Sequence, residues 1–315
     1  MAWHPDMARI IEAVQSAPSI FGQRAWDAVL AGEARDRVDL YANADQVPGA
    51  SPREVAISCG AALYNLRLAI RVAGRTPSVW MLPGLDEESP LIDHLGSGRV
   101  LVASVEVMPD RAAPPTGGVQ ELYEAIWLRH IDRGPTAFLP VPLPLLVEME
   151  DAAAEEHGWL RVLHPREQKA ILRATARHGD LAARAVQLMT LSTDDDRPFD
   201  WLRAGQALQH ALLTGTRYSM STGAGRSARY RVSLKYGLSD WHPLRPRPRL
   251  PGDYGVTASF FDQSLERADL DRRPRSWPWR SFYNEVPQVV LRVGFAPVER
   301  VPAPPLYRAE SAETE

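Results

Sequence analysis

One short segment of the sequence occurs twice, far apart along the chain. The run CGAAL from Cys59 to Leu63 begins one long apolar-periodic stretch, and the run AGQAL from Ala204 to Leu208 begins another. Each stretch is followed by a strand-like run, 100–107 in the first case and 288–294 in the second. A spacing of this size is too long for a solenoid repeat. It predicts two domain-sized halves packed together, and the seam between such halves is a favoured place for a ligand.

The length and composition are those of a globular protein. The chain has 315 residues, of which 45% are hydrophobic, and this is enough for one large or two ordinary domains. The net charge of -3 argues against general nucleic-acid binding, because that affinity rests on clustered surplus cations. The N-terminus lacks the pattern of a signal peptide, and no stretch approaches the roughly 18 consecutive apolar residues of a membrane span. We therefore expect a cytoplasmic protein without a membrane partner.

Local signals predict several long helices and few buried strands. Ser51, Pro52 and Glu54 fit the N-cap, first helical position and capping box of a helix that ends at Gly74. Further helices are expected at 8–17, 121–129, 144–157, 166–184 and 199–218, and strands at 38–41, 160–163 and 186–191. This mixture predicts an α+β or α/β protein.

The segment 224–285 differs from the rest because it is rich in arginine, proline and aromatic residues. Its prolines make regular structure unlikely in much of it, so we expect a lid, a binding loop or a partner surface. The run RPRPR at 245–249 fits either a site for an acidic ligand or a rigid connector, and the connector is favoured. The tail 309–315 is expected to be disordered.

Most other site chemistry finds little support in the sequence. Cys59, the one cysteine, lies in an apolar helix-like run, so a buried and inert thiol is favoured over a catalytic one. The eight histidines lack metal-ligand spacing, and no metal site is expected. The run of Asp194, Asp195 and Asp196 fits a metal or phosphate site or a solvated turn, and the turn is favoured. The glycines of 223–228 fit neither the Rossmann nor the P-loop spacing.

Three motifs resemble the nitroreductase superfamily, and in particular its actinobacterial Acg-type branch. They are residues 51–69, 200–208 and 287–297, and the likeness extends with gaps over about 8–223 and 286–308. The resemblance implies an FMN-binding α+β fold made of two fused nitroreductase-like halves. It also implies hydride transfer through the flavin N5 to or from a small organic substrate, with NAD(P)H as a candidate reductant.

This resemblance places the first half at 1–118 and the second at 119–308, with 224–285 inserted in the second. Its flavin-gripping turn is similar to Arg129, His130, Ile131, Asp132 and Arg133. Arg129 would contact phosphate or ribityl oxygens, and Arg133 would bring positive charge to the pyrimidine edge. Apart from the family, Arg129, Asp132 and Arg133 also fit a helix-end salt-bridge cluster.

The resemblance implies further flavin contacts in three places. Ser219, Met220 and Ser221 match a loop whose backbone amides approach the isoalloxazine ring, although an ordinary helix C-terminus is about as well supported. Arg308 is similar in position to a phosphate-binding residue near the family's C-terminus, and a lone exposed arginine is the alternative. Ser19 and Arg24 lie in the segment that corresponds to the family's Pro-Ser-x-x-Asn-x-Gln-Pro-Trp motif.

The chain departs from the family pattern at Gly22, Arg24, Ala25, Ile131 and Ser219. A glycine cannot replace the contacts of a hydrogen-bonding asparagine amide. The departures favour a second hypothesis, in which the fold is kept and flavin redox chemistry is lost. The protein would then be a binding or partner protein or catalyse a non-redox reaction. With either hypothesis we expect a small-molecule partner, aromatic or acidic, no nucleic acid, and a monomer or homodimer; no catalytic residue is assigned.

Overall fold

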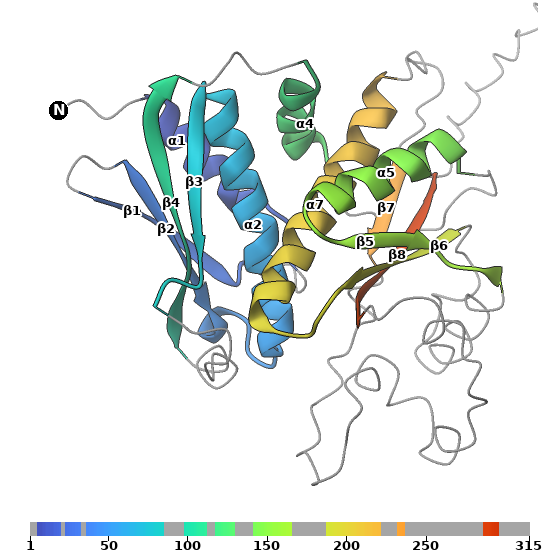
Figure 1. The fold of residues 1–315 in the computed structure, drawn as a ribbon, viewed down its shortest axis with the longest axis horizontal. Coiled ribbons are helices and arrows are strands. Elements are labelled where there is room, and N and C mark those ends of the chain that lie inside the picture. Colours follow the sequence, from blue (N-terminus) through green and yellow to red (C-terminus); the bar gives the residue numbers. More distant parts are fainter. Residues whose placement is uncertain are drawn as a thin grey trace, which may run out of the picture.

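The computed structural model is an α+β protein, drawn in Figure 1, in which residues 5–19, 23–32, 36–84, 98–111, 117–129, 141–165, 187–221, 232–236 and 286–295 are described. The first part of the chain forms α1 (Pro5–Gln15), β1 (Trp26–Ala31), β2 (Arg37–Asn43), η1 (Ala44–Gln46), α2 (Pro52–Val72), β3 (Arg75–Met81) and β4 (Arg99–Arg111). The second part forms α4 (Gly117–Leu128), α5 (Leu143–Glu155), β5 (Trp159–Val162), β6 (Gln187–Thr193), α7 (Pro198–Ser221), β7 (Val232–Tyr236) and β8 (Val286–Phe295).

The strands form two four-stranded antiparallel sheets with the same internal order. The first sheet runs β1-β2-β4-β3 and the second runs β5-β6-β8-β7. In both sheets a long helix connects the second strand in the chain to the third: α2 in the first and α7 in the second. Figure 1 shows these two helices lying between the sheets. The chain therefore repeats one order of elements on either side of a central helix pair.

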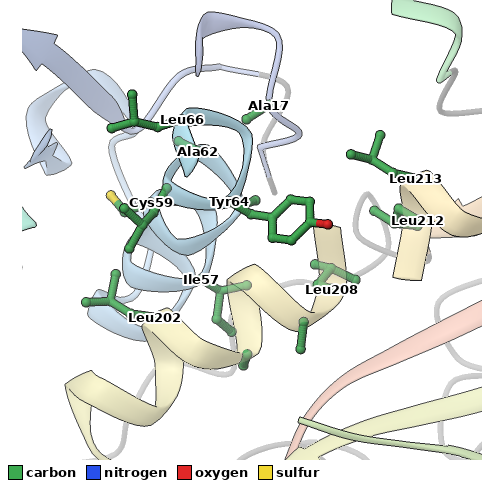
Figure 2. Close-up of a cluster of buried hydrophobic side chains, with 14 of the residues drawn as sticks. Ala17, Ile57, Cys59, Ala62, Tyr64, Leu66, Leu202, Leu208, Leu212 and Leu213 are labelled. Atoms are coloured by element: carbon green, nitrogen blue, oxygen red, sulfur yellow. The ribbon is translucent and has the colours of Figure 1, made fainter. Parts of the chain in front are cut away.

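The two long helices touch backbone to backbone at a pair of glycines. A Cβ atom on Gly60 would strike the carbonyl oxygen of Leu202, and one on Gly205 would strike the carbonyl oxygen of Ile57. Each glycine thus packs on the residue that lies three positions before the other glycine, so the contact is reciprocal. Figure 2 shows Ile57 and Leu202 in this region of the core. The repeated segment of the sequence forms the crossing point itself.

Helix α2 begins as its sequence predicts. The Ser51 side chain accepts a hydrogen bond from the Glu54 backbone, and the Glu54 side chain accepts one from the Ser51 backbone, which completes the capping box. After the helix ends, Gly74 has a φ of +73°, a conformation that costs glycine little. By length and composition α2 also passes for a membrane-spanning helix, but 83% of the relevant stretch is buried inside the protein. Helix α2 is therefore a central helix of the protein core.

Cys59 is buried on α2, as the apolar periodicity predicts. It is 0% exposed, and its Sγ atom lies 3.7 Å from the Ala25 carbonyl oxygen. Burial raises the pKa of the thiol well above its ordinary value, so the reactive thiolate is suppressed.

Most elements agree with the sequence prediction, and the differences have physical causes. Strands β1 and β3 were not predicted; β3 contains Pro77, which removes a ladder donor and is tolerated because β3 is an edge strand. Strand β7 lies within 224–285, where we expected little regular structure. The predicted helix at 166–184 lies outside the described residues.

The interpretation of Asp194, Asp195 and Asp196 as a solvated turn is wrong for Asp196. Its carboxylate is 14% exposed and pairs with Arg53 from the start of α2. It also accepts a hydrogen bond of 2.6 Å from the Trp201 indole. Asp196 therefore ties the first part of the chain to the second.

Candidate functional site

The structure brings three of the proposed flavin-contacting residues to the C-terminal end of α1. Ser19 lies four residues after this end and is half-buried. Arg24 is exposed and lines a hollow together with Gln15, the last residue of α1. Arg129, which follows α4, donates a hydrogen bond of 3.3 Å from Nη2 to the Ser16 carbonyl oxygen. The candidate site is therefore the place where the ends of α1 and α4 meet.

The Arg129 guanidinium has two hydrogen-bond donors that no described residue accepts. Its Nε and Nη1 atoms are buried and have no hydrogen-bond partner among the residues that the structure describes. A buried donor without a partner costs free energy on the order of 1–3 kcal/mol, and more when the group is charged. An anionic oxygen at this position would satisfy both atoms. Arg129 also fills a structural role, because a cation beside a helix C-terminus is stabilised by the helix dipole and by the free carbonyls.

A buried polar pair links α1 to the two central helices. Gln209 Nε2 donates to Asn65 Oδ1 at 2.8 Å, and Asn65 Nδ2 donates to the Ala13 carbonyl oxygen at 2.8 Å. Both side chains are 0% exposed, and Gln209 Oε1 has no partner in the described part of the chain. Ala13 lies one helical turn before Ser16, whose carbonyl receives Arg129. These amides hold the end of α1 in place for Arg129.

The equivalent pair on the other side of the helix crossing is aromatic. Tyr64 and Gln209 each lie four residues after their glycine, and Asn65 and His210 each lie five residues after it. The Tyr64 and His210 rings stack with their centroids 4.8 Å apart and their planes at 26°. Figure 2 shows Tyr64 reaching from α2 towards α7.

Charged groups surround this aromatic pair. Arg67 donates to Gln206 at 2.7 Å and pairs with Glu156, and the Nδ1 atom of His210 lies 3.9 Å from Glu155. Burial, and after it the positive charge of nearby Arg67, lowers the pKa of His210 to about 4, so the ring is neutral at pH 7. Sequence reasoning missed this cluster. The available signal was the presence of polar residues at core positions of two apolar helices.

The hollow beside Arg24 has a volume of about 360 Å³ and is lined by Gln15, Arg24, Trp26, Asp27, Ala28, Val29 and Arg99. Asp27 accepts hydrogen bonds from Asn43 at 2.9 Å and Gln46 at 3.2 Å, and it lies 3.6 Å from the Arg99 guanidinium. The lining contains two arginines and one carboxylate, so the hollow has a net positive charge. The carboxylate already accepts hydrogen bonds from two amides.

Of the remaining proposed flavin contacts, the structure corrects three and does not describe the other four. Ser219, Met220 and Ser221 form the last turn of α7 and not a loop after it. In an α-helix the amides of the last turn already donate to carbonyls four residues earlier, so they are not available to a flavin ring as the loop hypothesis requires. His130, Asp132, Arg133 and Arg308 lie outside the described residues. Among the described residues, no group of three or more His, Cys, Asp or Glu side chains is arranged to hold a metal ion.

Comparison with known proteins gives one similar solved structure to report. No protein-family model matches the chain, and a search of the curated proteins finds no match. The solved structure comes from Anabaena variabilis and is described as a "putative nitroreductase". It is similar with a TM-score of 0.48 and 10% sequence identity, over 91% of this chain and 73% of that chain. A likeness of this size identifies neither a family nor an activity for this chain.

Proposed function

We propose that the protein is an FMN-binding oxidoreductase of the nitroreductase type, acting on a small organic substrate. The observation that carries this proposal is the Arg129 guanidinium, which holds two buried N–H donors without partners in the described part of the chain. Arg129 is also the residue that the family resemblance assigns to the flavin phosphate or ribityl oxygens. When bound, FMN would supply hydride transfer through its N5 atom.

The residues around Arg129 fit this role in part. The Ser16 carbonyl fixes one guanidinium nitrogen and leaves the other two for an oxyanion. Ser19 is close enough along the chain to contribute its hydroxyl at the same helix end. The last turn of α7, which no described contact joins to Arg129, ends in free carbonyl groups rather than free amides and so offers hydrogen-bond acceptors and no donor.

We propose further that the two halves arose from one ancestral unit with a nitroreductase-like fold. The equal strand order, the equivalent long helices and the reciprocal contact of Gly60 with Gly205 support this origin. The halves would be 1–118 and 119–308, with 224–285 as an insertion. A cytoplasmic location, NAD(P)H as reductant and a monomeric or homodimeric state belong to the same proposal.

A second candidate function is that of a binding protein that has lost flavin redox chemistry. It is favoured by the helical state of Ser219, Met220 and Ser221, which removes the amide contact expected near the flavin N5. It is also favoured by the structural role that Arg129 fills at the end of α1.

Absorption spectra and FMN titration of the purified protein separate the two candidates. The oxidoreductase predicts flavin bands or saturable FMN uptake, and Arg129→Ala should weaken FMN binding at least about tenfold because a charge-assisted hydrogen bond is lost. Arg129→Lys keeps the charge without the planar fork and should give an intermediate loss. Arg203→Ala is the control, because Arg203 stacks on Phe199 near the start of α7, away from α1.

Arg129 also caps α1, so thermal unfolding of each variant must show that the fold is retained. A colourless protein that takes up no FMN would refute the oxidoreductase and support the binding protein. Unchanged FMN affinity in a folded Arg129→Ala variant would refute the site.

A further inference from the structure

The hollow beside Arg24 runs along the free edge of β1. Its lining includes the four consecutive residues from Trp26 to Val29, which point to both faces of the sheet, and no residue of β2. Residues of both faces can share one hollow only at the edge of a strand. In the described part of the chain, β2 is the one strand that pairs with β1. The hollow therefore lies on the side of β1 that faces away from the sheet.

The backbone of β1 presents donors to this side. The Asn43 amide donates to the Ala25 carbonyl at 2.9 Å, and the register continues this pairing with Asp27 opposite Tyr41. In an antiparallel ladder, residues alternate between bonding their partner and pointing away from it. Both the N–H and the C=O groups of Trp26 and Ala28 consequently point towards the free edge, so the backbone offers two donors there beside two acceptors.

Side chains add further donors to the same place. Arg99 crosses the outer face of β2 with its guanidinium 4.0 Å from the centre of the Tyr41 ring. Arg24 is exposed, and the structure gives it no ion pair with a described residue. The single carboxylate, Asp27, already receives two amide hydrogen bonds and the charge of Arg99.

We propose that this hollow is a ligand site for a small molecule that carries a carboxylate or phosphate group. Guanidinium and backbone N–H groups are donors, and an oxyanion is the chemistry that accepts from both of them. The volume of about 360 Å³ lies in the range of small-molecule sites. The hollow shares Arg24 with the flavin contacts that the family resemblance implies, but its other donors lie at the edge of β1 and on Arg99, and the proposal does not rest on flavin binding at Arg129.

The test uses succinate and inorganic phosphate as probes, titrated by calorimetry into the full-length protein at low ionic strength, with no FMN added. Succinamide, which has the shape of succinate without its charges, is the matched control ligand. Saturable binding of succinate or phosphate is expected, and succinamide should not bind. A preference for one of the two probes identifies which oxyanion the hollow favours.

Two variants locate the binding. Arg24→Gln and Arg99→Gln should each weaken it about tenfold, which corresponds to the loss of one charge-assisted hydrogen bond. Arg203→Gln should bind as the unchanged protein does. Thermal unfolding confirms the fold of each variant, and Arg24, being exposed, is the safer of the two changes.

The proposal would be overturned if neither oxyanion bound saturably up to about 10 mM. It would also be overturned if the folded Arg24→Gln and Arg99→Gln variants bound the oxyanion as tightly as the unchanged protein does. Because no flavin is present, failure here is separate from failure of FMN uptake. Loss of oxyanion binding in Arg129→Ala but not in Arg24→Gln would place the anion at the other site and refute this one.

Discussion

The contact between Gly60 and Gly205 makes a strong prediction about stability. A Cβ atom at Gly60 would lie 2.9 Å from the Gly205 Cα and 2.9 Å from the Leu202 carbonyl carbon, and closer still to the Leu202 oxygen. All of these are backbone atoms, so no side chain can rotate away. The Gly60→Ala variant can be accommodated only if α2 and α7 move apart.

The expected loss follows from two opposing effects. Overpacking a core typically costs about 1–3 kcal/mol, and backbone atoms on both sides put this site at the upper end. Replacing a helical glycine by alanine returns up to about 1 kcal/mol through helix propensity. We therefore expect Gly60→Ala to lower the free energy of unfolding by about 2 kcal/mol, with a fall in Tm of roughly 3 °C for a chain of 315 residues.

Urea unfolding followed by tryptophan fluorescence and circular dichroism measures this loss. Gly118→Ala is the control, because a Cβ there approaches only the end of the Arg217 side chain, at 3.4 Å. Gly205→Ala should behave like Gly60→Ala. The double variant should lose less than the sum, since one separation of the helices relieves both clashes. A Gly60→Ala protein as stable as the unchanged chain would refute the close helix contact.

Two further predictions concern the charged groups near the seam. The folded pKa of His210 is lowered to about 4 from 6.5. The neutral ring therefore contributes its full stability above pH 6.5, and this stability is lost as pH falls from 6.5 towards 4, by on the order of 2 kcal/mol at pH 4.5. Urea unfolding at pH 7 and pH 4.5 checks this, and His210→Gln should remove that part of the pH dependence; an unchanged dependence would show that other groups cause it. Asp196→Ala should cost about 3 kcal/mol, because Arg53 and the Trp201 indole lose their acceptor. The neighbouring Asp195→Ala, whose carboxylate is 56% exposed, should cost well under 1 kcal/mol, and similar losses for the two variants would contradict the placement of Asp196.

Local signals in the sequence predict the central helices well. Ser51, Pro52 and Glu54 fix the start of α2 because capping depends on neighbours within three residues. The apolar periodicity around Cys59 also gives its burial correctly. The end of α7 is three residues later than predicted, which turns Ser219, Met220 and Ser221 from a loop into a helical turn. Nothing local marks that end, since no glycine or proline stands there until Gly223.

The polar contacts of the site depend on distant parts of the chain. Asn65 meets Gln209, and Arg67 meets Glu156, across more than eighty residues in each case. Spacing along the sequence carries no sign of such pairs. The sequence did single out Arg129, Ser19 and Arg24, but the contact of Arg129 with the end of α1 depends on how distant parts of the chain pack.

The crossing of α2 and α7 also bears on what each flank of the molecule can recognise. In an assembly of identical subunits every substitution appears on both sides of the axis, so the two flanks must stay alike. Here both helices belong to one polypeptide, and equivalent positions hold Tyr64 on one helix and Gln209 on the other. One flank consequently has stacked rings with an imidazole, and the opposite flank has a pair of neutral amides. The two flanks are thus free to specialise for chemically different molecules.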